Sequence, residues 1–244
     1  MPLILGAQSA TAAAGYSVDN SCRFNDGDSP ALSRTNSTFS SRKTFTISAW
    51  VKRGVIAATG TGTYPTIWTS YKSPDRHLLY IFDMALVHLE FYGTTGGSAD
   101  CYLRSSMQLR DMSAWYHVQA VIDTTNAVEA ERIKLFVNGT RLTDFQSGPI
   151  YPSLNADIGS VVSGATMYWG AGSGMNSFDG YLSQCTYLDG QTVAPTAFGE
   201  FNSDSPTIWQ PIDYKDDVTF GNEGCYLDFA DSGDLGDDES GNTN

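Results

Sequence analysis

The chain has 244 residues, among them 13 Tyr, 12 Phe, 5 Trp and 24 Gly, and its formal net charge is −13 at pH 7. Such a charge argues against a nucleic-acid partner and against an anionic membrane surface. No apolar run is long enough to span a membrane, so we expect no membrane insertion. An all-β sandwich, rich in aromatic strands and glycine turns, can fill this length as one domain.

The two ends of the chain differ from its middle. Residues 1–16 are small and apolar, show no period and lack a basic n-region, so we interpret them as an arm rather than a signal peptide. Residues 211–244 hold ten Asp or Glu and one Lys, so nine of the thirteen net negative charges lie there. We therefore predict an arm at 1–16, a sandwich at 17–210 and an acidic C-terminal segment with a late strand at 211–244. Our hypothesis is that the arm docks the domain onto a larger particle.

Short strands follow one another along the chain, separated by turns rich in Gly, Asn and Asp. In the first half we predict strands at Ser21–Phe24, Ala31–Thr35, Thr44–Val51, Ile67–Tyr71, Leu78–Phe82, Leu86–Tyr92 and Cys101–Arg104. In the second half we predict strands at Tyr116–Asp123, Ile133–Val137, Thr140–Phe145, Met167–Gly170, Phe178–Leu188, Thr207–Gln210 and Gly224–Phe229, and one helical turn at Ala194–Phe198. Strands this short and this regularly spaced predict a two-sheet antiparallel jelly-roll sandwich.

The clearest period of two lies in the central meander. Val118, Ala120 and Ile122 alternate with His117, Gln119 and Val121, a pattern typical of a half-buried strand. Asn138-Gly139 has the residue types of a type I′ hairpin turn between the second and third strands. We expect Trp115 and Phe136 to be buried in this meander, and a second sheet to cover its apolar face.

Four cysteines, Cys22, Cys101, Cys185 and Cys225, are scattered along the chain without CxxC spacing. This spacing favours four reduced thiols and argues against a zinc site.

Four stretches, taken in order, resemble laminin-G-like, concanavalin A-like jelly-roll domains. They are SRKTFTISAWVKRG, WYHVQAVIDT, IKLFVNGTRL and FDGYLSQCTYLDGQTVAPTAFGE, and the resemblance covers roughly residues 18–200. Many such domains carry an Asp-Glu pair in the strand after the F-x-G turn. Here the matching positions are Ser183 and Gln184, which weakens an inherited calcium site.

The variant with YLDGQ, P-x-x-F-G-E, IWQP and YLDF resembles virion proteins of tailed bacteriophages. The resemblance implies a place on tail fibres or capsid appendages, where such domains act in adsorption or structure. It also implies assembly in the host cytoplasm, other virion proteins as partners, and a homo-oligomer, with a trimer preferred by analogy with phage fibres. Fold does not determine function, so these are expectations from analogy.

Catalytic chemistry is not indicated. Glucanases of this architecture use carboxylates spaced as E-x-D-x-E on one strand, which places them on one face. No such run is present, and Glu90 is the one acid inside a predicted interior strand. His77, His88 and His117 lie in separate strands without metal-ligand spacing. We therefore expect no catalytic residue and no cofactor.

Calcium binding is possible, because carboxylate oxygens are the ligands that Ca²⁺ prefers. The candidates are Asp26, Asp28, Asp231, Asp234, Asp237, Asp238 and Glu239. None follows the EF-hand order, and runs of acidic residues are usually solvated. No residue is therefore assigned to a metal.

Glycan binding would require exposed aromatic faces beside polar groups. Trp68, Tyr71, Tyr92 and Tyr168 lie beside predicted loops, whereas Trp50, Trp115, Trp169 and Trp209 are predicted to be core residues. We interpret the chain as a non-enzymatic virion protein with two alternatives open: a module that binds a host surface glycan, and a purely structural capsid decoration. A glycoside hydrolase is the third and weakest alternative.

Overall fold

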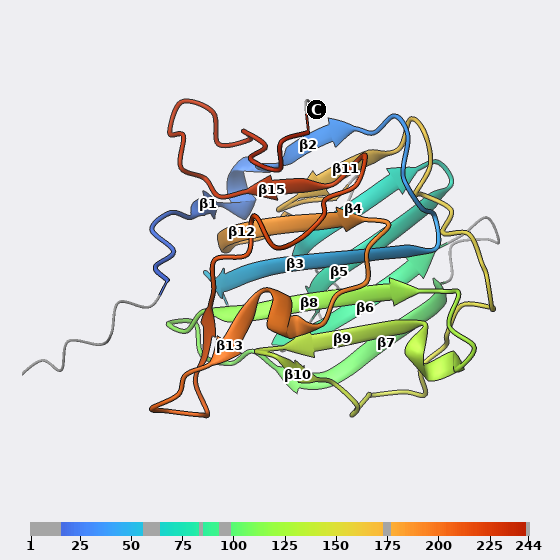
Figure 1. The fold of residues 1–244 in the computed structure, drawn as a ribbon, viewed down its shortest axis with the longest axis horizontal. Coiled ribbons are helices and arrows are strands. Elements are labelled where there is room, and N and C mark those ends of the chain that lie inside the picture. The colour runs from blue at the N-terminus through green and yellow to red at the C-terminus, as the bar shows by residue number, and fades with distance from the viewer. Residues whose placement is uncertain (1–15, 56–63, 83–84, 93–98, 173–176, 243–244) are drawn as a thin grey trace, which may run out of the picture.

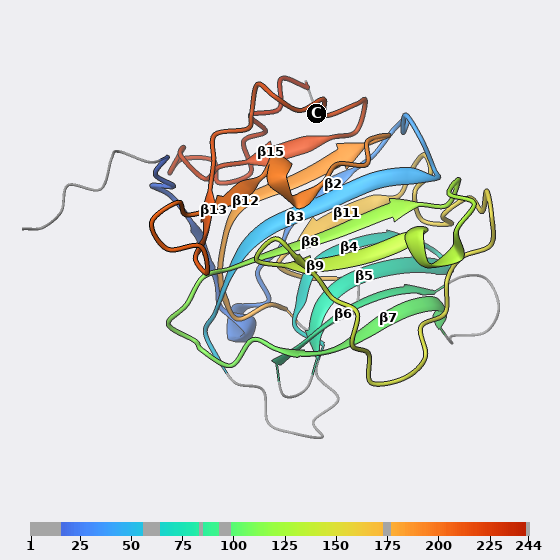
Figure 2. The ribbon, with the colours of Figure 1, turned by 60° about the horizontal axis from the view of Figure 1, so that its bottom comes forward.

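The computed structural model describes residues 16–55, 64–82, 85–92, 99–172 and 177–242. Two antiparallel sheets pack face to face as a sandwich, which confirms the predicted fold class (Figures 1 and 2). The predicted arm, apart from Tyr16, lies outside the described residues. No helix in the described part of the chain is long and apolar enough to cross a membrane.

The strands fall into two large sheets and one small hairpin. The first sheet has the order β1 (Cys22–Phe24), β12 (Gly180–Asp189), β3 (Thr44–Arg53), β8 (Tyr116–Asp123), β9 (Ile133–Val137) and β10 (Thr140–Arg141), and β15 (Cys225–Leu227) also pairs with β12. The second sheet has the order β2 (Leu32–Thr35), β11 (Thr166–Trp169), β4 (Thr66–Lys72), β5 (Asp75–Phe82), β6 (Leu86–Tyr92) and β7 (Ala99–Gln108). The hairpin joins β13 (Gly199–Phe201) to β14 (Trp209–Pro211). Single 3-10 turns occur at η1 (Asp26–Asp28), η3 (Glu129–Glu131) and η4 (Pro195–Ala197).

Every strand predicted from the sequence has a counterpart within a few residues, and the predicted helical turn is η4. The tight turn of the meander is also confirmed, because Asn138 and Gly139 both have positive φ, at 47° and 73°. Among the strands of the described residues, β13 alone was not predicted. The division of the chain at 17–210 and 211–244 stays a prediction, although β15 of the acidic segment is hydrogen-bonded to β12.

The core between the sheets is built around three aromatic side chains with no exposed surface. Trp68 stacks on Tyr187 with ring centroids 5.9 Å apart, and Phe45 lies 5.6 Å from Tyr187. The expectation that Trp68 lies beside a loop is therefore wrong. A register shift between Thr66 and Trp68 breaks the alternation of β4 at that point and lets Trp68 share the inner face.

The outer face of the first sheet is also covered, whereas the sequence pattern of β8 predicted a half-buried strand with one face in solvent. His117, Gln119 and Val121 of β8 are buried along with their inward-facing neighbours. Figure 1 shows the orange and red chain after β12 returning in front of β3 and β8. That chain packs a second apolar cluster against the sheet, comprising Leu188, Phe198, Tyr214, Phe220 and Tyr226. Strand β8 is therefore buried on both faces.

Two polar side chains on this covered face donate to the covering chain. Thr46 Oγ1 donates to the Gln191 carbonyl at 2.9 Å, and Gln119 Nε2 donates to the Val193 carbonyl at 3.0 Å. These bonds offset the cost of burying polar side chains in a strand. One face of β8 therefore packs in the apolar core, and the other face forms hydrogen bonds with the covering chain. Neither face is open to solvent.

Two residues of the meander are less buried than predicted. Trp115 precedes β8 and is 36% exposed. The alternation of β8 places it on the outer side of the sheet with His117, while Tyr116 packs against the core. Phe136 lies on the outer face of β9 and is half-buried, since the covering chain does not extend fully over this strand. The prediction of burial is wrong for Trp115 and only partly correct for Phe136.

We predict that Trp68→Ala lowers the free energy of unfolding by about 3–5 kcal/mol, because it leaves a large cavity between the sheets. Trp115→Ala is the matched control and should cost less than about 1 kcal/mol, as expected for a surface side chain. Urea denaturation followed by circular dichroism measures both. Equal losses in the two variants would contradict this assignment of the core.

All four cysteines are free and buried, which confirms the prediction of reduced thiols. Burial raises the pKa of Cys101 to about 12 and that of Cys225 to about 11, so these thiols are protonated and unreactive at neutral pH. We predict that the native protein takes up no iodoacetamide label, and that the protein unfolded without reductant takes up four. Mass spectrometry counts the labels, and two or fewer labels in the unfolded protein would reveal a disulfide.

Candidate functional site

Several residues singled out from the sequence meet on the outer face of the second sheet. Tyr71, Tyr92 and Tyr168 are there, and so are His88 and Glu90 of β6. Strand alternation explains the grouping, because these residues alternate with core residues such as Trp169, Leu89 and Phe91. The structure thus places three of the four loop-side aromatic residues on the same face as the one acid predicted in a strand.

The strand register arranges this face in three rows. The first row is Thr166, Tyr71, Arg76 and Tyr92. The second row includes Tyr168, Thr69, Glu90 and Tyr102. The third row is Tyr80, His88 and Arg104. We refer to these residues together as the second-sheet face.

Glu90 is the buried centre of the second-sheet face. Its side chain is 1% exposed, and Arg104 Nε donates to its Oε1 at 2.5 Å. The Tyr92 hydroxyl donates to the other carboxylate oxygen, Oε2. Burial alone would raise the pKa of Glu90, but hydrogen bonds from Arg104, Tyr92 and Tyr80 outweigh it, and the pKa is lowered. The carboxylate is therefore ionised and held on both oxygens.

His88 lies two residues before Glu90 on the same face, and its Nδ1 is 3.3 Å from the Tyr80 hydroxyl. Burial lowers the pKa of His88 to about 4, although the Glu90 charge acts in the opposite direction. Burial also raises the pKa of Tyr80, so both groups are neutral at pH 7. Tyr64 packs edge-on against Tyr80 at 5.4 Å and helps to cover it.

The rim of the second-sheet face is partly open and combines rings with cations. The Arg76 guanidinium lies 4.5 Å from the centre of the Tyr92 ring, and that of Arg104 lies 4.2 Å from the Tyr102 ring. The Arg104 side chain remains 37% exposed. Aromatic faces beside fixed N–H donors are groups that bind the apolar faces and hydroxyls of a sugar.

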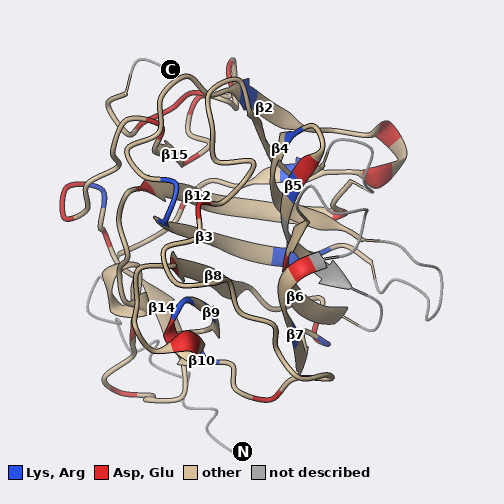
Figure 3. Cartoon of the chain, turned by 90° about the vertical axis from the view of Figure 1, so that its right-hand side faces the viewer, with Lys and Arg blue, Asp and Glu red and all other residues tan. Residues whose placement is uncertain are grey.

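Charge is distributed unevenly around the second sheet. Its strands carry Asp75, Glu90 and Asp100 as well as Arg34, Lys72, Arg76 and Arg104, but of the cations Arg76 and Arg104 are the two on the second-sheet face. The other acidic residues visible in Figure 3 lie mostly in loops. Within a chain of net charge −13, this face therefore presents cations near its surface.

The geometry of the second-sheet face suits binding better than hydrolysis. A glycosidase requires one carboxyl group as a general acid and a second about 5–10 Å away. Glu90 is ionised and engaged by Arg104 and Tyr92, so it is a poor proton donor. The residues two positions away along β6 are His88 and Tyr92, neither of which supplies a second carboxylate.

The other two histidines do not lie on this face. His77 is buried on the inner side of β5 beside Phe91 and hydrogen-bonds to Ser160. His117 lies on the covered face of the first sheet, where its Nε2 is 2.8 Å from Ser48 Oγ. Burial lowers the pKa of both rings to about 3. The three histidines thus occupy three separate environments, as their spacing in the sequence indicated.

The acidic candidates for calcium mostly make internal contacts. Asp28 accepts from Asn25, Glu239 pairs with Lys215 at 2.6 Å, and Asp231 and Asp234 accept from nearby backbone N–H groups. Within the described ranges, no three His, Cys, Asp or Glu side chains are grouped to hold a metal ion.

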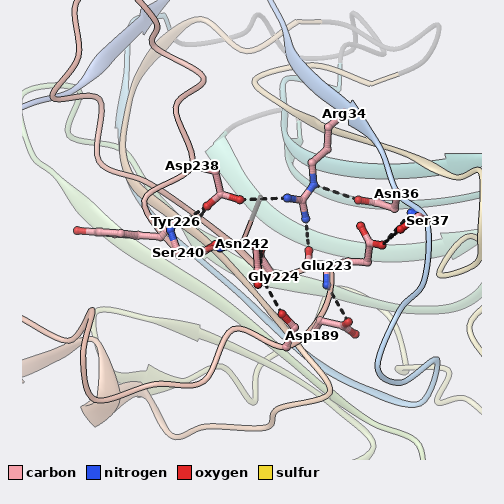
Figure 4. A network of polar contacts seen from close by, with 11 residues as sticks. Arg34, Asn36, Ser37, Asp189, Glu223, Gly224, Tyr226, Asp238, Ser240 and Asn242 are labelled. Carbon is pink, nitrogen blue, oxygen red and sulfur yellow. Dashed lines mark hydrogen bonds and ion pairs between the residues drawn. The ribbon is translucent and has the colours of Figure 1, made fainter. Parts of the chain in front are cut away.

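Asp238 belongs to a polar network that ties the acidic segment to β2 (Figure 4). Its Oδ2 lies 3.1 Å from Arg34 Nη1, and its Oδ1 accepts from the Tyr226 and Ser240 backbone N–H groups. Arg34 also donates to Asn36 and to the Glu223 carbonyl. These contacts join β2 to the acidic segment, so the role of the network is to hold the segment in place.

Sequence reasoning missed six residues of the second-sheet face: Thr69, Arg76, Tyr80, Tyr102, Arg104 and Thr166. The i, i+2 spacing of His88 with Glu90 and of Tyr102 with Arg104 was visible and places each pair on one face of a strand. What the sequence did not provide was the register that sets Arg104 beside Glu90.

Comparison with known proteins agrees with this architecture. A family model described as the concanavalin A-like lectin/glucanases superfamily matches residues 25–194. No curated protein matches the chain.

Three solved structures are similar at low identity. Laminin G domains 4–5 of the mouse laminin α1 chain share 14% identity at a TM-score of 0.50, over 79% of this chain and 48% of that one. The binding domain of Paraclostridial mosquitocidal protein 1 shares 14% at a TM-score of 0.50, over 74% and 42%. Tailspike protein 2 of Escherichia coli O157:H7 bacteriophage CAB120 shares 10% at a TM-score of 0.47, over 78% and 25%. This chain spans less than half the length of each, and at such identities the first two comparisons show the fold alone.

The buried histidines predict a loss of stability in mild acid. Folded-state pKa values of about 4 for His88 and about 3 for His77 and His117 lie below the ordinary value of about 6.5. As the pH falls below 6.5, the unfolded chain takes up protons that the folded chain does not, so the free energy of unfolding falls.

Each histidine should contribute a slope of roughly 1.4 kcal/mol per pH unit between pH 6.5 and its folded pKa. Urea denaturation at several pH values above and below 6.5 measures that slope. His88→Gln should reduce it by about one third, since one of three titrating groups is removed. A free energy of unfolding that stays constant across this range would contradict the burial of neutral histidines.

Proposed function

The chain belongs to the concanavalin A-like lectin/glucanases superfamily, and from this we propose that it is a non-enzymatic, glycan-binding virion protein of a tailed bacteriophage. Its place is a tail fibre or a capsid appendage, where it binds a glycan of the host surface. The observation that carries the glycan-binding part is the second-sheet face, in which Glu90 fixes Arg104 and Tyr92 beside open aromatic rings.

The proposed binding surface is rigid before any ligand arrives. Arg104 is held by Glu90 and by the Tyr102 ring, and Tyr92 is held by Glu90 and the Arg76 guanidinium. Side chains fixed in advance lose little conformational entropy on binding, which favours recognition of a flexible glycan. With two guanidinium groups at the rim, a glycan that carries carboxylates is favoured over a neutral one.

The phage assignment is supported by the sequence variant with YLDGQ, P-x-x-F-G-E, IWQP and YLDF. Assembly in the reducing cytoplasm of a host is consistent with four buried, free thiols. Other virion proteins are then the protein partners.

Purely structural capsid decoration is the second candidate, and one observation favours it. The hairpin of β13 and β14 exposes 45% of Phe201 and 56% of Ile208, and exposed apolar groups of this kind mark protein contacts when they form a patch. In either role we propose that the protein forms a homo-oligomer, with a trimer preferred. Light scattering can measure the mass of this oligomer.

A glycan array of bacterial surface polysaccharides, probed with the purified protein, tests the main proposal. We expect binding to carboxylate-bearing glycans, and at least about a tenfold loss of affinity in Tyr71→Ala and in Tyr102→Ala, worth about 1.4 kcal/mol. Phe201→Ala is the matched control, because it removes an exposed ring outside the second-sheet face. We also expect no reducing sugar to be released.

Two outcomes would overturn this proposal. An array without any bound glycan, together with a defined oligomer that incorporates into particles, would favour decoration. Turnover of a bound polysaccharide that disappears in Glu90→Gln would instead identify a hydrolase.

A further inference from the structure

A cleft lies over the outer face of the first sheet, on the side of the sandwich opposite to the second-sheet face. Its volume is about 500 Å³, and its lining includes Tyr16, Asn20, Trp50, Trp115, Ser183 and Pro211. This volume lies within the range of about 300–1,000 Å³ that is typical of small-ligand sites. We refer to it as the first-sheet cleft, and it shares no residue with the second-sheet face.

An irregularity in β12 builds one wall of this cleft. The pairing of β12 with β3 shifts register between Ser183 and Thr186, and Gln184 has a positive φ of 46°. Ser183 Oγ then donates to the Asn20 carbonyl at 2.6 Å, and Gln184 Nε2 donates to the Tyr16 hydroxyl at 2.9 Å. The bulge therefore fixes the segment 16–21 as a wall.

Ser183 and Gln184 stand at the two positions where many domains of this kind carry an Asp-Glu pair. A neutral pair at these positions can donate hydrogen bonds, which two carboxylates cannot do. The departure from the family pattern thus has a visible consequence, namely the attachment of residues 16–21 to β12.

Aromatic rings line the first-sheet cleft at two depths. Trp115 and Tyr16 are 36% and 38% exposed. Trp50, only 7% exposed, packs against the His117 ring at 5.3 Å. The indole Nε1 of Trp50 has no hydrogen-bond partner among the described residues. This indole N–H is enclosed by the protein, like those of Trp68, Trp169 and Trp209, so the rings of Trp115 and Tyr16 are the surfaces open to a ligand.

We propose that the first-sheet cleft binds a neutral saccharide of one to three sugar rings. Trp115 and Tyr16 supply flat apolar surfaces for sugar rings, and the polar groups of Ser17, Asn20 and Ser21 line the same space. This inference goes beyond the function proposed above, because it assigns a separate site with a different ligand chemistry to the other sheet.

Charge favours a neutral sugar over an acidic one. Asp19 is the one charged residue among those described as lining the cleft, and its carboxylate accepts from Ser17 Oγ at 2.7 Å. Since no lining residue is a cation, a ligand carboxylate would be repelled without compensation. The second-sheet face, with Arg76 and Arg104, has the opposite preference.

Saturation-transfer NMR and tryptophan fluorescence on the full chain test the proposal, with cellobiose, lactose, chitobiose and maltotriose as probes. We expect at least one probe to bind at millimolar concentration. Trp115→Ala should then weaken that binding at least about tenfold, while Trp115→Phe, which keeps a ring, should stay within about threefold of the wild type.

Two controls separate this site from the rest of the molecule. Tyr181→Ala removes a ring of similar exposure from β12 that does not line the cleft, and Tyr71→Ala alters the second-sheet face. Both should leave binding of the neutral probe unchanged. The proposal is overturned if no probe gives saturation transfer, or if Trp115→Ala binds as the wild type does. A loss caused by Tyr71→Ala alone would move neutral sugars to the second-sheet face and leave the function proposed above intact.

Discussion

Two buried carboxylates, Asp189 and Glu223, hold the C-terminal segment against the sandwich, and the rest of the structure depends on them. Asp189 has no exposed surface, and its Oδ2 accepts from the backbone N–H of Ser40 and of Glu223. Glu223 Oε1 in turn accepts from the N–H groups of Ser37 and Thr38. Truncating either carboxylate would leave buried backbone N–H groups without a partner, at roughly 1–3 kcal/mol for each. The contact between Ser37 and Glu223 joins segments 186 residues apart.

Attachment of that segment determines which surfaces are left for ligands. The chain after β12 covers the outer face of the first sheet at β3 and β8, including the His117 ring. Pro211 of the same chain lines the first-sheet cleft. The second sheet has no equivalent cover in the described chain over its rim, where the Arg104 side chain keeps a third of its surface. One sheet thus offers a narrow cleft and the other a broader face, and the two surfaces differ in charge.

The strands could be predicted from the sequence, but the segments that cover the sheets could not. A period of two fixes which residues of β8 share a face, but it cannot tell whether solvent or a distant segment lies against His117 and Gln119. Bulges limit the prediction in the same way. The register shift beside Trp68 turns a predicted loop-side ring into the centre of the core. Trp115, one position before β8 and on the side of His117, remains exposed. The hydrogen bond between Arg104 and Glu90 could not be predicted either, because it depends on the register between β6 and β7.

Glu90 shows why a binding module can retain a buried charge that adds little net stability. A buried ion pair often contributes no more than an apolar replacement would, since desolvation offsets most of the attraction. What the pair supplies here is geometry: the carboxylate fixes Arg104 on one oxygen and the Tyr92 hydroxyl on the other, and each then holds a neighbouring ring or guanidinium. An apolar residue at position 90 would leave both side chains free to rotate, and binding would then have to order them. The buried charge is therefore better understood as preorganisation of the rim than as a source of stability.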